Sequence, residues 1–105
     1  MKQKCYQLLK KVPKGKITTY KQLAKALNTK AYRAVGLYMK QNHDPKIPCH
    51  RVVKSTGEIG EYNKGKNQKI NLLQKEGIKI KNQKIQEFKQ HLFKFNNTDF
   101  LPHKK

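Results

Sequence analysis

Acidic residues are scarce in this sequence. The 105 residues include only 6 Asp and Glu against 25 Lys and Arg, which gives a formal net charge of +19 at pH 7. Such an excess destabilises a compact chain by self-repulsion, and a polyanionic partner explains it best. Arginine is also scarce, because only Arg33 and Arg51 accompany 23 lysines. Since lysine can supply charge alone, each arginine position is expected to need the planar guanidinium group.

Long apolar runs are missing as well. No stretch approaches the ~20 apolar residues of a membrane span, and no apolar signal-peptide region follows Met1. Cys5 and Cys49 lie far apart without a C-x-x-C motif, so neither a zinc site nor a disulfide framework is indicated. We therefore expect a cytoplasmic protein (nucleoid-associated in a prokaryote) with no metal, no cofactor and room for one modest domain.

The most informative stretch is Cys49-His50-Arg51, which lies between Pro48 and the β-branched pair Val52-Val53. Pro48 fixes the backbone before the thiol, and the β-branched pair predicts a buried extended segment after it. The reactive form of a thiol is the thiolate, which needs a proton acceptor near neutral pH. His50 is the obvious acceptor, but adjacent side chains point apart, so a relay through one water fits better than direct contact. The alternative is a structural Cys beside a surface His.

Helical patterns precede this stretch. Residues 2–11 indicate a helix that buries Cys5, and a turn follows at residues 12–15. Thr19 is placed to cap a helix that begins at Tyr20, and a second helix is expected from Ala31 to about Gln41. Two short helices joined by a short link indicate a helix-turn-helix. In the second helix, Ala31, Ala34, Val35, Tyr38 and Met39 recur at helical spacing.

The outer face of that second helix suits a ligand. Ala34 and Gly36 are small and allow close approach of the backbone, while Arg33 points away from the core. The alternative for Arg33 is an ordinary solvated side chain. Because it is one of only two arginines, we favour a functional role.

The second half of the chain is predicted to hold a small hairpin and two helices. Residues 54–60 indicate a turn that would pair Val52-Val53 with a second short strand, as a wing beside the helix-turn-helix. Gly65 and Gly77 bracket a helix with Ile70, Leu73 and Leu72 inward. Residues 83–95 are expected to form a further amphipathic helix, with Ile85, Phe88, Leu92 and Phe95 inward, and residues 96–105 a disordered end. We accordingly divide the chain into a domain at 1–82 and a C-terminal helix and tail at 83–105.

Glu76 occupies an unfavourable position, in the last turn of the helix that Gly77 closes. The negative end of the helix dipole repels a carboxylate there. This placement suggests a specific partner, with an exposed surface Glu as the alternative.

The run Pro48-Cys49-His50-Arg51-Val52 resembles the active-site signature of the O6-alkylguanine-DNA alkyltransferases, also called methylated-DNA–protein-cysteine methyltransferases. Further segments match this family in order: Pro13-Lys14-Gly15-Lys16, Thr19-Tyr20, Gln22-Leu23-Ala24, Arg33-Ala34-Val35-Gly36, Asn42, Gly60, Tyr62, Leu72-Leu73 and Glu76-Gly77. The resemblance covers about residues 4–80 and corresponds to the family's C-terminal catalytic and DNA-binding domain. It implies a mainly α fold with a small β hairpin, as a single winged helix-turn-helix-like domain.

The resemblance also implies a reaction: direct, irreversible transfer of an alkyl (methyl) group from O6-alkylguanine in DNA to Cys49. By the same resemblance, His50 takes the thiol proton through a water and Glu76 orients His50. Other implied roles are base flipping for Tyr20 and Arg33, DNA contact for Ala34 and Gly36, a hinge at Asn42, pocket lining for Met39, Val52 and Tyr62, and motif positions for Pro48 and Arg51. The implied partner is double-stranded DNA, bound by a monomer through the minor groove with little sequence specificity, and no membrane is involved.

Two departures from the family pattern stand out. Members usually carry a ribonuclease-H-like domain ahead of this region, and Lys64 stands where many have Gly, which predicts a more basic or narrower pocket mouth. A competing hypothesis is a non-enzymatic sensor, since alkyltransferase-like proteins bind O6-alkylguanine but replace the acceptor Cys, often with Trp. Cys49 favours the enzyme. A winged-helix transcription regulator would explain the charge but not the Cys49 motif.

Overall fold

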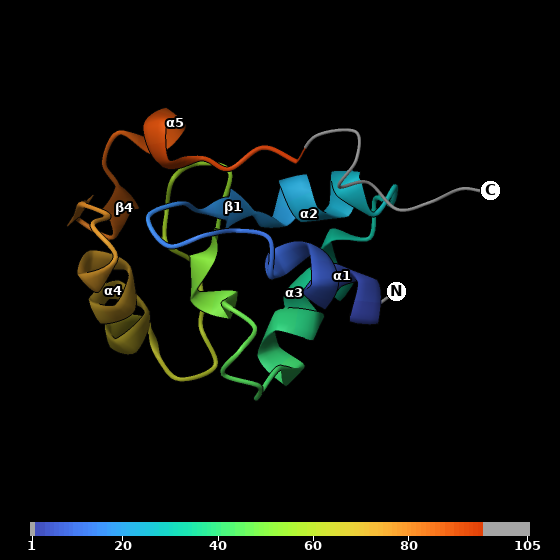
Figure 1. Cartoon of the computed structure of the whole chain (residues 1–105). Helices are drawn as coiled ribbons and strands as arrows, with labels where there is room; N and C mark the ends of the chain where they lie inside the picture. Colours follow the sequence, from blue (N-terminus) through green and yellow to red (C-terminus); the bar gives the residue numbers. More distant parts are fainter. Residues whose placement is uncertain (1, 96–105) are drawn as a thin grey trace.

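The computed structural model describes residues 2–95, so the expected disorder of residues 96–105 lies outside the described part. It confirms the predicted fold class, a small and mainly helical domain with a strand hairpin (Figure 1). None of the described helices is long and apolar enough to cross a bilayer. The elements are α1 (Lys2–Leu9), β1 (Thr18–Thr19), α2 (Tyr20–Ala26), α3 (Tyr32–Gln41), the 3-10 helix η1 (Cys49–Arg51), β2 (Val52–Val53), α4 (Lys66–Lys75), β3 (Ile80–Lys81), β4 (Lys84–Ile85) and α5 (Phe88–His91).

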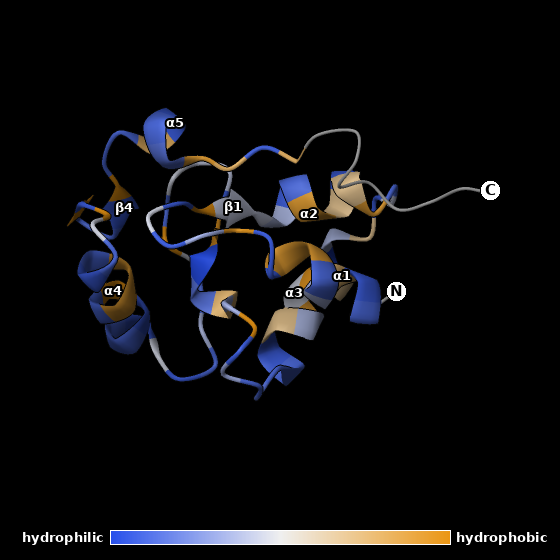
Figure 2. Cartoon of the chain, in the orientation of Figure 1, coloured by the Kyte–Doolittle hydropathy of each residue, from blue (hydrophilic) through white to orange (hydrophobic). Residues whose placement is uncertain are grey.

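The molecule has two halves, joined by the short parallel pair of β1 and β2. Helices α1, α2 and α3 pack together on one side, and α4, the β3–β4 hairpin and α5 lie on the other (Figure 1). Each half has its own apolar cluster, and the first, larger one includes Cys49. The polar and apolar residues of α1 and α4 lie on different sides of each helix (Figure 2). The Cys49-His50-Arg51 triplet of η1 therefore lies where the two halves meet.

The helix-turn-helix forms as predicted. The Thr19 side-chain hydroxyl accepts a hydrogen bond from the Gln22 backbone N–H at 2.9 Å and caps α2. In α3 the buried residues are Val35 and Met39, whereas Ala31 is the exposed N-cap residue. The buried face of α3 is thus narrower than the sequence predicted, which leaves more of the helix surface for a partner.

The turn predicted after Val53 forms, since Lys54 N–H donates to Glu58 O at 2.9 Å, but the predicted pairing of Val52-Val53 with a strand after that turn is wrong. Strand β2 pairs in parallel with β1, with Thr18 opposite Val52 and Thr19 opposite Val53. All four residues are buried, so the pair forms inside the molecule instead of at an exposed edge. The antiparallel hairpin is instead β3–β4, with Ile80 opposite Ile85.

The predicted helix over 83–95 is also wrong. Only Phe88–His91 is helical, because Glu87 has a left-handed backbone (φ 54) that interrupts a helix from Ile85. Beyond α5 the chain runs beside Ile17, whose N–H donates to His91 O at 2.9 Å and whose carbonyl accepts from Phe93 N at 2.7 Å. The apolar residues of this range are spaced as on one face of a helix, but in the structure they belong to a strand, a short helix and an extended segment. The division of the chain at residue 82 stays a prediction.

Helix α4 lies where Gly65 and Gly77 predicted it. Both glycines have positive φ, at 96 and 91, which favours glycine over other residues at each helix end. Leu73 is buried as expected, while Ile70 is half-buried. The buried face also contains Lys69, which the sequence did not indicate.

Candidate active site

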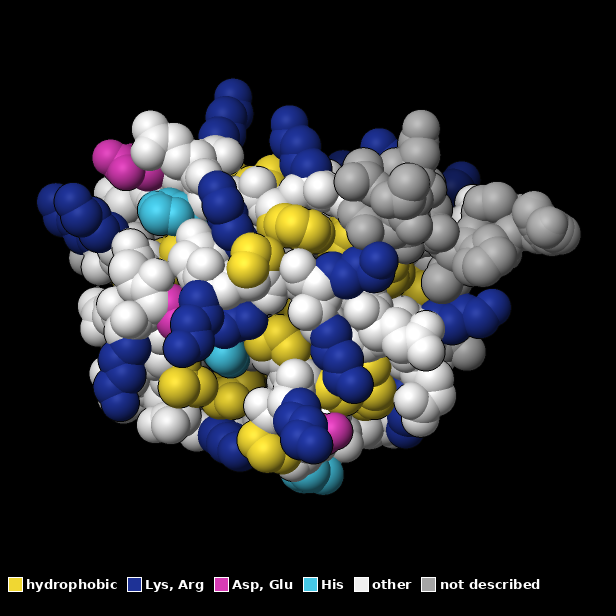
Figure 3. Space-filling view, viewed as in Figure 1, with side chains coloured by type: hydrophobic (Ala, Val, Ile, Leu, Met, Phe, Trp, Pro, Cys, Tyr) yellow, Lys and Arg dark blue, Asp and Glu magenta, His cyan; other side chains and the backbone are white. Residues whose placement is uncertain are grey.

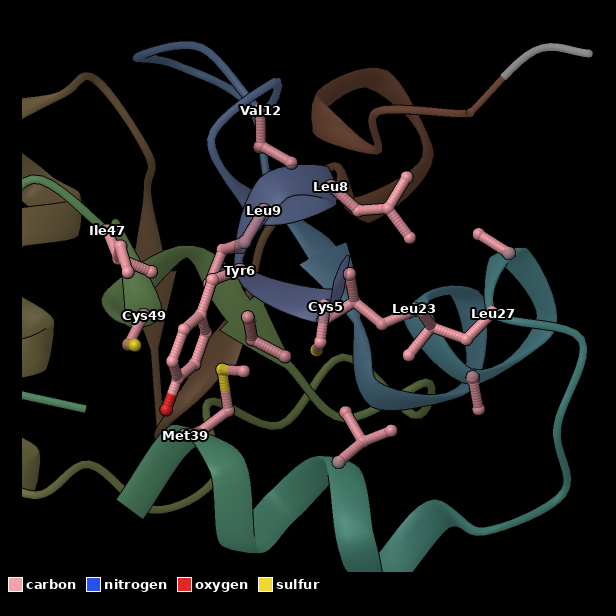
Figure 4. Packing of buried hydrophobic residues seen from close by; sticks show 14 residues of the cluster. Cys5, Tyr6, Leu8, Leu9, Val12, Leu23, Leu27, Met39, Ile47 and Cys49 are labelled. Carbon is pink, nitrogen blue, oxygen red and sulfur yellow. The ribbon is translucent and has the colours of Figure 1, made fainter. Parts of the chain in front are cut away.

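Cys49 begins a single 3-10 turn directly after Pro48. Its N–H donates to Ile47 O at 2.8 Å, and Arg51 N–H donates to Pro48 O at 3.0 Å. The Cys49 side chain is 6% exposed and lies at the edge of the first apolar cluster, near Ile47 and the ring of Tyr6 (Figure 4). The stiff bend that the sequence predicted at Pro48 therefore holds a thiol with little access to solvent.

Asn42, at the C-terminal end of α3, is hydrogen-bonded to that thiol. Its Nδ2 lies 2.9 Å from Cys49 Sγ and 3.2 Å from Asp44 O, while its Oδ1 accepts from Asp44 N at 3.1 Å. Asn63 in turn donates from its side chain to Asn42 O. Asn42 thus joins α3 to the Cys49 loop, a position that suits a hinge.

The carboxylate of Glu76 joins the other two residues of the triplet. His50 Nε2 lies 2.9 Å from Glu76 Oε2, and Arg51 binds both carboxylate oxygens, from Nε at 2.9 Å and from Nη2 at 2.7 Å. Arg51 Nη1 also donates to Val12 O at 2.8 Å, beyond the end of α1. The Glu76 carboxylate, which lies at the unfavourable C-terminal end of α4, is therefore compensated by two specific partners, His50 and Arg51. In the described part of the chain, no hydrogen bond joins Cys49 directly to His50.

The electrostatics of these groups follow from burial and their neighbours. Burial raises the pKa of the Cys49 thiol, while the Asn42 hydrogen bond and the charge of Lys69 lower it in part. Burial also lowers the pKa of His50, although Glu76 opposes this shift, so the imidazole is neutral near pH 7 and can accept a proton. Burial alone would raise the pKa of Glu76, but hydrogen bonds from Arg51 and His50 outweigh it and hold the pKa below its ordinary value.

The second cysteine differs sharply from Cys49. Cys5 is fully buried in α1, and burial raises its pKa to about 12. A thiol with that pKa has almost no thiolate at neutral pH. Cys5 is therefore a core residue, as its position on the inner face of the first helix predicted.

A cavity of about 580 Å³ opens beside Cys49. It brings together six of the residues that the sequence singled out, namely Tyr20, Arg33, Gly36, Met39, Cys49 and Tyr62. Ala34 and Val52 line neither this cavity nor a second one of about 200 Å³. The second cavity lies beside Asn42, Cys49 and His50, and Lys64 lines it instead of the larger one.

The outer surface near the larger cavity carries charge and two exposed apolar side chains. Arg33, Lys40 and Lys54 line the cavity, and lysine and arginine side chains also spread over the face of the molecule that Figure 3 shows. Arg33 is exposed, as predicted, and Tyr32 and Leu37 on the same helix are 49% and 51% exposed. Both line the larger cavity, and sequence reasoning missed them. Both are large apolar residues that fall outside the buried stripe of the helix, and this mismatch in the sequence could have indicated them.

Residues 1–78 match the family model described as 6-O-methylguanine DNA methyltransferase, DNA binding domain. A bifunctional methyltransferase/endonuclease of Picrophilus torridus is 43% identical over 96 residues, which are 90% of this chain and 31% of that protein. A methylated-DNA–protein-cysteine methyltransferase of Thermococcus gammatolerans is 53% identical over 73 residues, which are 69% of this chain and 41% of that protein. The chain thus spans less than half the length of these curated relatives.

Solved structures share the fold of this chain, and two of them show how far the similarity extends. The O6-methylguanine-DNA methyltransferase of Pyrococcus kodakaraensis has a TM-score of 0.68 and 49% identity, over 73% of this chain and 46% of that chain. Atl1 of S. pombe, in complex with damaged DNA containing O6-carboxymethylguanine, has a TM-score of 0.79 and 27% identity, over 89% of this chain and 94% of that chain.

Proposed function

This chain belongs to the 6-O-methylguanine DNA methyltransferase family, because its residues 1–78 match the DNA-binding domain of that family. On that premise we propose that the chain repairs O6-alkylguanine in DNA. In this proposal the alkyl group moves irreversibly to Cys49, once per protein molecule. The observation that carries the proposal is the position of Cys49, a buried thiol beside a cavity large enough for a base, with Arg33 at the same cavity.

The chemistry follows from the hydrogen bonds around the triplet. His50 binds Glu76 through Nε2, which leaves Nδ1 to accept the Cys49 proton through a bridging water. The thiolate attacks the alkyl carbon, a sulfur–carbon bond forms, and the carbon–oxygen bond breaks with its electron pair left on the guanine O6. The proton held on His50 then neutralises the guanine anion. Because the thioether is stable, each chain reacts once.

Access to the thiol requires a base outside the stack. A base within a duplex cannot reach Cys49, and extruding it costs a few kcal/mol. We assign base flipping to the exposed Arg33, which would fill the gap in the stack, and to Tyr20, which is half-buried at the same cavity and would crowd the phosphate. The protein would bind as a monomer in the minor groove, with the small residues of α3 facing the DNA.

Binding should depend on salt because lysines supply most of the positive charge. Each phosphate contact contributes a slope of about −0.9 to log K against log salt. We expect a steep fall in affinity from 50 to 200 mM salt and little difference among undamaged duplex sequences, measured by fluorescence anisotropy. A strong preference for one undamaged sequence would instead favour a transcription regulator.

A second candidate function is lesion sensing without transfer. The likeness to S. pombe Atl1, which extends over 94% of that chain, favours it. The thiol in the cavity favours transfer, and the two candidates differ in one measurable product.

That product is methylated protein. The chain is mixed with duplex DNA containing one O6-methylguanine, and its intact mass is measured, with an unmodified duplex as the control. We expect every active chain to gain one methyl group on damaged DNA only. Tight lesion binding with no gain in mass would support the sensor and overturn the transferase.

A further inference from the structure

Lys69 on α4 is buried in an unusual way for a lysine. Its side chain is 0% exposed, and it is the only buried charged residue in the described range 2–95. Its Nζ donates to Val52 O at 2.6 Å and to Glu61 O at 2.9 Å. Because burial of an ammonium group is unfavourable without compensation, this position needs an explanation beyond packing.

The two carbonyl partners flank the reactive centre. Val52 follows the Cys49 triplet directly, and Glu61 lines the cavity next to Tyr62. One ammonium group therefore joins the strand that follows Cys49 to the loop through which Glu61 and Tyr62 line the same cavity as Cys49. It also tethers both segments to α4.

The compensation for this charge is incomplete. Among residues 2–95, Lys69 forms no ion pair, since the Glu61 carboxylate is 72% exposed and pairs with Lys66 at 3.4 Å. Burial lowers the pKa of Lys69 to about 7, Glu61 and Cys49 raise it in part, and Lys54 and Lys66 lower it further. The field of Lys69 in turn lowers the pKa of Cys49. The thiol is thus a titratable group whose charged form would compensate the buried ammonium.

We propose that Lys69 is a positioning residue of the alkyl-transfer site: it holds the Cys49 segment against the 61–62 loop, and its buried charge stabilises the Cys49 thiolate. This inference rests on the proposed function. When the thiol proton passes to His50, the sulfur becomes negative within range of the Lys69 charge, and the two charges compensate each other in a largely buried site. Lys69 also lowers the pKa of His50, so the proton accepted there is readily passed on to the guanine anion.

The test measures how readily Cys49 ionises, in the absence of DNA. The rate at which iodoacetamide modifies Cys49 is followed from pH 5 to 10 by mass spectrometry of the peptide that carries it. In Lys69→Gln the amide can still donate to a carbonyl but has no charge, so the pKa of the thiol should rise and the rate at each pH below that pKa, including pH 7, should fall about tenfold. Lys69→Arg, which keeps the charge, should recover part of the loss. The matched control is Lys75→Gln, an exposed lysine on the same helix, which should behave as wild type.

Two further readouts separate this role from a structural one. Single-turnover transfer should slow in Lys69→Gln while affinity for undamaged duplex stays unchanged. In the unmutated Lys69 background, NMR titration should show that Lys69 loses its proton at lower pH in Cys49→Ala than in wild type, because the coupling is reciprocal. This titration remains decisive if the Lys69 variants fail to fold.

An unchanged iodoacetamide profile in folded Lys69→Gln would overturn the proposal, as would identical Lys69 titrations with and without Cys49. These outcomes are independent of repair. If the wild type transfers no methyl group but Lys69→Gln shifts the thiol profile, the proposed function fails while the coupling of Lys69 to Cys49 stands.

Discussion

The outer face of α3 and the buried centre around Glu76 use the two arginines of the chain in opposite ways. Arg33 is exposed and forms no hydrogen bond or ion pair with the rest of residues 2–95. Arg51 places Nε and Nη2 on Glu76 and Nη1 on Val12 O. Arg51 uses its planar guanidinium within the fold, whereas the guanidinium of Arg33 is exposed and available to a partner. The exposed face would provide access to the lesion, and the buried centre would provide the chemistry.

The largest expected effect on methyl transfer comes from replacing Cys49 beside the buried centre. Cys49→Ala should abolish methyl transfer, because the acceptor atom is gone, while affinity for a lesion-containing duplex stays largely intact. Transfer is measured with radiolabelled methyl groups, and binding by gel shift. Cys5→Ala serves as the control and should retain transfer. Residual transfer in Cys49→Ala would remove Cys49 from its role and point to Cys5.

The second prediction concerns the free energy of unfolding, which should depend on Arg51 much more than on Arg33. Arg51→Met leaves the Glu76 carboxylate with His50 as its remaining partner and Val12 O without its donor in a largely buried site, so we expect a loss of about 2–3 kcal/mol in the free energy of unfolding. Arg33→Met removes an exposed side chain and should change it by less than about 0.5 kcal/mol. Urea unfolding followed by circular dichroism measures both. Equal losses would contradict the comparison.

The third effect separates them by function. Arg33→Ala should slow single-turnover transfer from duplex DNA by roughly tenfold or more, since extrusion of the base costs a few kcal/mol that the arginine would offset. Arg33→Lys should restore binding but only part of the rate, because lysine lacks the planar group. The defect should shrink when the lesion lies opposite a mismatch or in a single strand. Equal losses on paired and unpaired DNA would mean that Arg33 only contacts phosphate.

The smallest effect is the response of the centre to pH. The folded pKa values of Glu76 and His50 both lie below their ordinary values. Each group therefore contributes stability that is present above its unfolded pKa, about 4.3 for Glu and 6.5 for His, and is lost as pH falls through the folded value. The free energy of unfolding should decrease from pH 7 to pH 4. Glu76→Gln should be less stable than wild type at pH 7, and the difference should narrow only below about pH 4, where Glu76 becomes protonated, as urea titrations at each pH would show.

The sequence predicted the local parts of this structure well. Thr19 as a cap and the helix between Gly65 and Gly77 depend on residues close in the chain, and both are confirmed. The predicted wing failed because the partner of Val52-Val53 is Thr18–Thr19, a pairing set by burial between two distant segments. The helix over 83–95 failed because a left-handed Glu87 and pairing with Ile17 override the apolar spacing.

The site shows a similar limit. Family resemblance indicated that Cys49, His50 and Glu76 belong together, and the structure places His50 against Glu76. The bidentate hydrogen bonding of Arg51 to Glu76 was not predicted, because no local sequence pattern connects the two residues. Lys69 was missed for a related reason: nothing in the sequence distinguishes the one buried lysine from the many exposed ones.

The most direct test of the central claim is the location and number of transferred groups. Wild-type chain is incubated with a large excess of O6-methylguanine duplex, digested, and analysed by tandem mass spectrometry. The account predicts one methyl group per chain, carried as a thioether on Cys49, with no further release of repaired DNA after that single event. Methyl groups on Cys5 or on several residues, or continued repair beyond one equivalent, would contradict it.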